Sequence, residues 1–328
     1  MPRIGMNPNR DHKTDYHPAR ITLAMLTYLP EEAGYFEHRF DVTRLSLESL
    51  IANTPQPYDL LVFDNGSCPR MVDYLRGLRD TGKIHYLFLS SRNIGKIGAL
   101  QFIFNAAPGE IVAYTDDDVF FLPGWLEEHM KVLEAFPQAG LVTGFYIRDH
   151  VIYGMKSVEA FARLPDVEVQ RGLFWEKEWI KHFVDNMGRT LEGYAEETKG
   201  MQDVILHCQG VEAYASAGHH QFVTRRSILL NALPKEWDSL LMGKMVHLEN
   251  TIDEMGYLRL STRQPFTRLL GNVISQENAE MARAYHLDAS AARIQSSGSA
   301  LRRLFRLSLV QSLARRVYHW MFKIINTK

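Results

Sequence analysis

Three consecutive aspartates, Asp116, Asp117 and Asp118, are the residues of this sequence best suited to do chemistry. They closely follow the apolar run IVAY, which predicts a strand ending near the first of them. Because side chains alternate along a strand, we expect Asp116 and Asp118 on one side and Asp117 on the other. Two converging carboxylates without a sequence-adjacent Lys or Arg repel each other, and a hard divalent cation, Mg²⁺ or Mn²⁺, would join them. The alternative interpretation is an aspartate-rich cap for the helix around Trp125.

Polar residues also follow two other predicted strands, in TYLP (27–30) and in DNGS (64–67). Asp64 is placed to accept hydrogen bonds from a ribose or a base edge, although Asp-Asn-Gly-Ser is also an ordinary turn. In SRNIGKIGA (91–99), Gly95 permits close backbone approach and Lys96 offers a contact to a phosphate or a base. This segment matches neither the P-loop nor the dinucleotide fingerprint.

Alternating strand-like and helix-like patterns predict the elements that position these residues. The expected strands are ITLAMLTYL, YDLLVFD, KIHYLFLSS and EIVAYTDDD, and the expected helices are RFDVTRLSLESLIANT, MVDYLRGLRDTG and IGALQFIFNAA. The order βαβαβαβ indicates a parallel sheet with helices on both faces, whose strand ends share one rim.

The later part of the chain is less regular. WLEEHMKVLEAFP and LLMGKMVHLENTIDEMG predict helices, and LVTGFYIRD and YLRLST predict strands. VILHCQGVEAYASAGHHQFVTRR predicts paired strands, and the charged, aromatic residues 156–203 predict helical elaboration. Because no repeat or low-complexity linker interrupts the pattern, we expect one compact domain with two lobes.

Composition excludes several protein classes. The 328 residues are 46% hydrophobic, enough for a substantial core, and the net charge of −1 argues against nucleic-acid binding. Two cysteines are too few for a disulfide framework and fit a reducing compartment. With no signal peptide and no long apolar run, the sequence predicts a cytoplasmic protein, with contact at the inner face of the membrane as an option.

The termini differ from the rest of the chain. Residues 1–20 are polar and predict a flexible tail, and residues 291–328 predict basic amphipathic helices. The segment 299–328 has no acidic residue, and Trp320 lies on its apolar side. This pattern is typical of peripheral docking on an anionic membrane, while packing on the catalytic body or in a homodimer interface is the alternative.

In this order and spacing, the segments resemble the GT-A-fold glycosyltransferases of the family 2 type over roughly residues 21–262. The resemblance implies an α/β fold with a Rossmann-like, mostly parallel nucleotide-binding half (21–122) and an acceptor-binding half (123–290). It also implies a role for each matching residue. The nucleotide base would be held by Thr27, Tyr28 and Asp64, with Asn93, Gly95 and Lys96 close by, and the metal and donor diphosphate would be held by Asp116, Asp117 and Asp118. One member of the Arg225–Arg226 pair, Arg225, is expected to bind donor phosphates.

The catalytic base is where this sequence departs from the family pattern. The family usually carries a Glu-Asp pair about a dozen residues before a Gly-Tyr, and Lys244-Met245 stands there instead. Inverting transfer needs a group that takes the proton of the acceptor hydroxyl. Glu249 is the first candidate, followed by His247 and Asp238. His219 and His220 could contact metal or acceptor, but a histidine pair in a strand is more often structural.

The resemblance therefore predicts a metal-dependent, inverting hexosyltransferase. It would move a sugar from a UDP- or GDP-linked donor to a hydroxyl on a glycan, a lipid-linked acceptor or a small molecule. A sugar nucleotidyltransferase is one alternative, but it would carry a Gly-rich basic loop after the first strand, where TYLPEEAGYF stands. A non-catalytic nucleotide-sugar or glycan-binding protein is the other alternative, favoured by the missing Glu-Asp pair.

Overall fold

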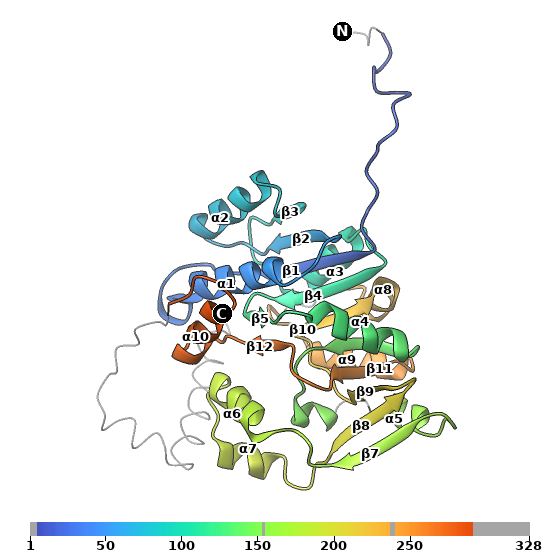
Figure 1. The fold of residues 1–328 in the computed structure, drawn as a ribbon. Coiled ribbons are helices and arrows are strands. Elements are labelled where there is room, and N and C mark those ends of the chain that lie inside the picture. Colours follow the sequence, from blue (N-terminus) through green and yellow to red (C-terminus); the bar gives the residue numbers. More distant parts are fainter. Residues whose placement is uncertain (1–4, 153–154, 237–239, 291–328) are drawn as a thin grey trace, which may run out of the picture.

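A mixed ten-stranded sheet organises the chain in a computed structural model that describes residues 5–152, 155–236 and 240–290. The strand order is β3-β2-β1-β4-β10-β6-β11-β9-β8-β7, and Figure 1 shows the sheet running from β3 to β7. The predicted α/β class is confirmed. Among the described residues, no helix is long and apolar enough to cross a membrane.

The first half of the sheet is parallel, as predicted. Its strands are β1 (Ile21–Thr27), β2 (Asp59–Asp64), β3 (Tyr86–Leu89) and β4 (Ile111–Asp116). The connecting helices are α1 (Arg39–Ala52), α2 (Pro69–Asp80) and α3 (Lys96–Ala106). Thr27 pairs with Asp64 and Leu26 with Asp116, so these strands end together at one rim.

The second half is mixed in direction. Its strands are β6 (Ala139–Thr143), β7 (Glu168–Gly172), β8 (Asp203–Cys208), β9 (Val211–Tyr214), β10 (Gln221–Arg225) and β11 (Leu258–Thr262). β10 runs antiparallel to β4, with Gln221 opposite Thr115 and Arg225 opposite Ile111. The start of β10 therefore lies at the aspartate rim and its end lies at the opposite edge.

Helices and short strands complete this half. They are β5 (Val119–Phe121), β12 (Thr267–Leu269), α4 (Trp125–Ala135), α5 (Lys156–Phe161), α6 (Lys177–Asn186), α7 (Leu191–Glu197), α8 (Arg226–Ala232), α9 (Met245–Glu254), α10 (Gln276–Ala284), and the 3-10 helices η1 (Gly34–Phe36) and η2 (Arg148–Ile152). Residues 156–203 contain the expected helices, but they also contain β7, which was not predicted. The C-terminal segment 291–328, for which we predicted amphipathic helices, lies outside the described residues.

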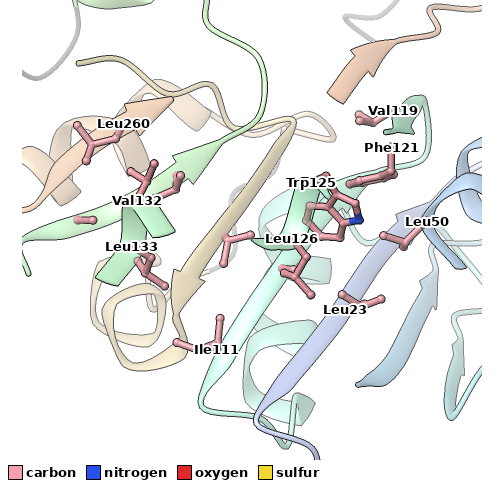
Figure 2. Close-up of a cluster of buried hydrophobic side chains, with 14 of the residues drawn as sticks. Leu23, Leu50, Ile111, Val119, Phe121, Trp125, Leu126, Val132, Leu133 and Leu260 are labelled. Carbon is pink, nitrogen blue, oxygen red and sulfur yellow. The ribbon is translucent and has the colours of Figure 1, made fainter. Parts of the chain in front are cut away.

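Burial on both faces of the sheet explains the continuous apolar runs of the central strands. In β1, Leu23 and Met25 belong to one core cluster, while Ala24 and Leu26 belong to the cluster on the other side. Figure 2 shows the first cluster, in which Leu23 from β1 lies near residues of α1, β5 and α4. This core sets the position of β4, and with it the position of the aspartates at its end.

Candidate active site

A cavity of about 370 Å³ opens at the rim formed by β1, β2 and β4. The residues that line it are Leu26, Tyr28, Tyr35, Phe36, Arg39, Asn65, Asn93, Lys96, Asp116, Asp117, Asp118, Leu241 and Met242. Of the residues predicted to bind the donor, this cavity therefore brings together Tyr28, Asn93, Lys96 and the three aspartates. We call it the rim cavity.

Lys96 is the first residue of α3, and its amine binds the carboxylate of Asp116. Its Nζ atom is 2.7 and 2.6 Å from the two carboxylate oxygens of Asp116, and the Tyr114 hydroxyl donates to the same carboxylate at 2.6 Å. Burial favours the neutral acid, but the charge and hydrogen bonds of Lys96 outweigh it and hold the pKa of Asp116 below its usual range. Asp116 is therefore ionised and paired.

Arg39, at the start of α1, binds the other two aspartates. Its Nη1 donates to Asp118 Oδ2 at 3.0 Å and its Nη2 donates to Asp117. Asp117 also accepts from Thr43 Oγ1 at 3.1 Å and from the backbone N–H of Tyr28 at 3.3 Å. Burial raises the pKa of Asp117 to about 6, despite the charge of Arg39. Through these hydrogen bonds, Asp117 connects the end of β4 to α1 and to the residue that follows β1.

These cations correct one premise of the sequence analysis. No Lys or Arg stands beside the aspartates in the sequence, yet the fold brings Lys96 and Arg39 to them. Lys96 was expected to contact the ligand, and its amine is instead bound to Asp116. The helix-cap alternative is wrong, because Gly124 occupies the cap position of α4 and no side chain caps that helix.

The three carboxylates and two cations leave one negative charge at the rim cavity. Asp116 and Asp118 have side chains that are 25% and 31% exposed, so their oxygens are accessible, and oxygen ligands suit Mg²⁺ or Mn²⁺. Within the described part of the chain, no three His, Cys, Asp or Glu side chains are grouped to hold a metal ion. The residues present fit a divalent cation only if ligand oxygens, such as phosphates, complete its coordination.

The turn after β2 forms another part of the wall. Asn65 Nδ2 donates to Asn93 Oδ1 at 3.0 Å, and the backbone N–H of Ile94 donates to Asn65 Oδ1 at 2.9 Å. Asp64, which we predicted at the nucleotide base, is fully buried beneath this wall. It accepts from the Ser67 N–H at 2.9 Å and from Thr27 Oγ1 at 3.1 Å. The contacts of Asp64 and Thr27 therefore support the turn rather than reach the cavity.

A second cavity, of about 230 Å³, shares Asp116 and Asp118 with the first. Its other lining residues are Ile147, Asp149, His150, Phe183, Asn186, Met187, Arg189, His219, His220, Leu269 and Gly271. Arg189 Nη1 pairs with Asp149 Oδ2 at 2.9 Å within this wall. Asp116 and Asp118 therefore line both cavities. We call the second one the histidine cavity.

Glu249 is one contact away from the histidine cavity. Its carboxylate is 1% exposed and lies 2.9 Å from His219 Nδ1 and 3.3 Å from Arg259 Nη1. Burial opposes its ionisation, but the hydrogen bond from His219 and the charge of Arg259 hold the pKa of Glu249 below its usual range. Glu249 is therefore an ionised carboxylate that does not itself meet solvent.

Other predicted residues are not brought to either cavity. Arg225 lies at the far end of β10, and its guanidinium donates to the backbone oxygens of Leu133 and Ala139 at 3.0 and 3.1 Å. The expectation that it binds donor phosphates is wrong in this structure, because β10 runs antiparallel to β4. His247 is an exposed residue of α9 and lines neither cavity. Asp238 lies outside the described residues.

Sequence reasoning missed several residues of the rim cavity. Arg39 begins a helix and carries no motif, so only the three-dimensional contact reveals it. Asn65 stands directly after Asp64, and the turn pattern there was the available signal. Tyr35 lies in η1, and Leu241 and Met242 come from the segment before α9, far away in the sequence; no local pattern indicated that these residues line the cavity.

A family model and several solved structures match this chain. The model of the family "Glycosyl transferase family 2" matches residues 35–210, more than half of the 328 residues. No curated protein matches. Among solved structures, S. aureus TarS 1-349 is 11% identical, with 76% of this chain and 60% of that chain covered and a TM-score of 0.44. The mannosyltransferase PcManGT from Pyrobaculum calidifontis is 24% identical, with 43% and 40% covered and a TM-score of 0.32. GalNAc-T7 is 13% identical, with 76% and 42% covered and a TM-score of 0.45.

Proposed function

The chain belongs to glycosyl transferase family 2, and from this we propose that it transfers a sugar, with inversion, from a nucleotide-linked donor to a hydroxyl acceptor. One observation carries the proposal: two cavities meet at Asp116 and Asp118. A transferase needs one site for each substrate and a junction where the reacting atoms meet. The rim cavity would hold the donor and the histidine cavity the acceptor.

Tyr28, Asn65 and Asn93 would bind the nucleotide of the donor, and the diphosphate would lie toward the aspartates. All of these residues line the rim cavity. A diphosphate beside three carboxylates and two cations would add negative charge to an already negative cluster. This excess supports the proposal that donor binding requires a divalent cation, Mn²⁺ or Mg²⁺.

Asp118 and Asp116 are the residues that would hold the cation. Arg39 binds only Oδ2 of Asp118, so the other oxygen is free of that contact. When bound, the ion would neutralise charge on the departing diphosphate. Lys96 and Arg39 would contribute two fixed positive charges beside it, and Asp117 would keep Arg39 in place.

The donor is proposed to be UDP- or GDP-linked. The matched structures include TarS in complex with UDP and with UDP-GlcNAc, and PcManGT in complex with GDP-Man and Mn²⁺. These ligands are therefore the first probes for this chain. The acceptor is proposed to be a hydroxyl on a glycan, a lipid-linked carrier or a small molecule, reached from the cytoplasmic side.

A thermal-shift panel tests the donor site. UDP-GlcNAc, UDP-glucose and GDP-mannose are each added with Mn²⁺ or with EDTA, and we expect at least one of them to raise the Tm only when Mn²⁺ is present. Free UTP with a sugar 1-phosphate tests the nucleotidyltransferase alternative, which would release pyrophosphate. Donor binding without any release of nucleotide would favour the non-catalytic binding protein. If no nucleotide sugar raises the Tm, the proposed function is wrong.

A further inference from the structure

We propose that His219, oriented by the buried carboxylate of Glu249, is the general base that activates the acceptor hydroxyl in the histidine cavity. The proposal rests on the proposed glycosyl transfer and names the group that the sequence could not identify. It replaces Glu249 as the base and makes Glu249 a positioning residue.

The position of His219 supports this role. Its side chain is 32% exposed and lines the histidine cavity together with Asp116 and Asp118. His219 lies in the loop before β10, and the next residue ties that loop to β4, because the Asp116 N–H donates to the His220 backbone oxygen at 2.7 Å. The imidazole is thus held at the junction where donor and acceptor would meet.

Glu249 determines which nitrogen of His219 carries the proton. An ionised carboxylate only accepts hydrogen bonds, so the contact at 2.9 Å requires a proton on His219 Nδ1. In the neutral ring, Nε2 then carries the lone pair. Among the described residues, the side-chain hydrogen bond of His219 is the one from Nδ1 to Glu249, and Nε2 is the ring nitrogen that does not face this carboxylate.

Arg259 keeps Glu249 in the ionised state. It is 2% exposed, lies 3.3 Å from Glu249 Oε2, and donates to the Ala217 backbone oxygen at 2.9 Å. A buried carboxylate that orients a histidine and stabilises its protonated form is a general arrangement for a base. Glu249 itself has 1% of its side chain exposed and does not line the histidine cavity, whereas its partner His219 does.

In the proposed step, His219 takes the proton of the acceptor hydroxyl as that oxygen attacks the donor sugar. The acceptor hydroxyl oxygen forms a bond to the anomeric carbon while its proton moves to His219 Nε2. The bond between the anomeric carbon and the diphosphate oxygen breaks, and its electron pair leaves with the nucleoside diphosphate. The imidazolium, paired with Glu249, then releases the proton to solvent.

Several other ionisable groups lie around His219 and Glu249. They are Arg259 on β11, His150 and Asp149 on η2, Arg189 beside α7, His220 in the same loop, Asp116 at the end of β4 and Asp118 in the following turn. Burial lowers the pKa of His220 to about 3, so this neighbour stays neutral. Burial likewise lowers the pKa of His150, whose ring lies 6.4 Å from that of His219.

The key variant is His219→Asn in the full-length chain. Its amide N–H can still donate to Glu249, so the buried pair keeps a partner, but it has no basic nitrogen at the Nε2 position. His207→Asn is the matched control, because His207 also lies beside a glutamate, Glu212 at 3.5 Å, in the β8–β9 hairpin outside both cavities. Each variant is assayed for nucleotide release from UDP-GlcNAc, UDP-glucose and GDP-mannose with Mn²⁺, with water as the acceptor.

We expect His219→Asn to lose about 100-fold or more in turnover while the donor-induced rise in Tm stays unchanged. Imidazole should restore part of the turnover of a His219→Ala variant. Glu249→Gln should lower turnover about tenfold or more and shift the pH profile of kcat/KM, which a purely structural role would not do. His207→Asn should behave as the wild type.

Turnover of His219→Asn within about threefold of the wild type would overturn the proposal, since general-base catalysis contributes far more. Loss of the donor-induced rise in Tm would also overturn it, because His219 would then act in donor binding. A wild-type protein that binds and cleaves none of the three donors would instead refute the proposed function, and this proposal with it.

Discussion

At the scale of single residues, the three aspartates have different surroundings and are expected to have different roles. Asp117 is 5% exposed and binds Arg39, Thr43 and the backbone of Tyr28. Asp118 is partly exposed and keeps one oxygen free of Arg39. These contacts favour a structural role for Asp117 and a ligand-binding role for Asp118.

Asp118→Asn tests this distinction. We expect the metal-dependent rise in Tm with donor to disappear and turnover to fall on the order of 100-fold, because a metal-holding carboxylate is lost. Asp117→Asn is the control and should keep metal dependence while losing about 1–3 kcal/mol of unfolding free energy. Equal loss of metal dependence in both variants would contradict the assignment.

The sequence indicated the three aspartates as candidate site residues, but it did not indicate which cations pair with their carboxylates. The predicted alternation does not extend past Asp116, because β4 ends there and Asp117 and Asp118 lie in the following turn, where Arg39 binds both of them. Lys96 and Arg39 reach the aspartates from other elements of the fold, so no pattern of neighbouring residues could reveal the pairing. The partners of Glu249 were missed for the same reason.

At the scale of elements, the contact between two turns shapes the rim cavity. Gly66 has a φ of +93°, and a Cβ there would lie 2.7 Å from the Arg92 carbonyl carbon and 2.9 Å from the Asn93 nitrogen. This close approach brings Asn65 and Asn93 into hydrogen-bond contact. The turn after β2 therefore depends on glycine at this one position.

Gly66→Ala should cost about 1–3 kcal/mol of unfolding free energy and weaken donor binding, because the turns must separate. Gly77→Ala in α2 is the matched control: nothing lies within 4 Å of the added Cβ, so it should be neutral or stabilise by up to about 1 kcal/mol. Urea unfolding and donor titration measure the two effects. Unchanged donor affinity in a destabilised Gly66→Ala variant would show that this contact does not shape the site.

His129 joins α4 to β10 and makes stability depend on pH. It is fully buried, with Nδ1 2.6 Å from the Trp125 backbone oxygen and Nε2 3.3 Å from Gln221 Oε1. Burial lowers the pKa of His129 to about 4. In the unfolded chain this histidine binds a proton below about pH 6.5, so its contribution to stability is lost as the pH falls from about 6.5 to 4.

We expect His129→Gln to remove the part of the pH dependence of unfolding free energy that comes from this histidine. Between pH 7.5 and 4.5 the wild type should lose about 2–3 kcal/mol more unfolding free energy than the variant. Urea midpoints of both proteins at the two pH values give the comparison. An equal loss in both would contradict the prediction.

The regular elements were predictable because their periodicity is local. The parallel strands follow from continuous apolar runs, and their helices follow from apolar residues at helical spacing. By contrast, β7 has the sequence EVQRG with mostly exposed side chains, and β5 and β12 have three residues each. Such segments carry too little pattern to indicate a strand, and only their pairing partners identify them.

At the scale of the whole molecule, one sheet joins a parallel first half to a mixed second half (Figure 1), and the turn between β4 and β5 carries Asp117 and Asp118. The sequence predicted the parallel strands β1 to β4, but not the antiparallel direction of β10. That direction removes Arg225 from the site and brings His219 to it.

The basic segment 299–328 is proposed to dock the protein on an anionic membrane. We expect the full-length chain to bind vesicles containing anionic lipid and to lose this binding at high salt, because the attraction is electrostatic. Arg315→Glu together with Arg316→Glu should weaken vesicle binding and leave nucleotide release unchanged. If the wild type and the double variant bound neutral and anionic vesicles equally well, the proposed docking through Arg315 and Arg316 would be contradicted.

The stereochemistry of transfer tests the central claim most directly. The wild-type protein is incubated with Mn²⁺ and the α-linked donor UDP-GlcNAc, UDP-glucose or GDP-mannose that it cleaves, and proton NMR records the first-formed sugar before it equilibrates. Attack from the face opposite the diphosphate predicts the β anomer, with release dependent on Mn²⁺ and lost in Asp118→Asn. An α anomer, or nucleotide release that is equal with Mn²⁺ and with EDTA, would contradict the account.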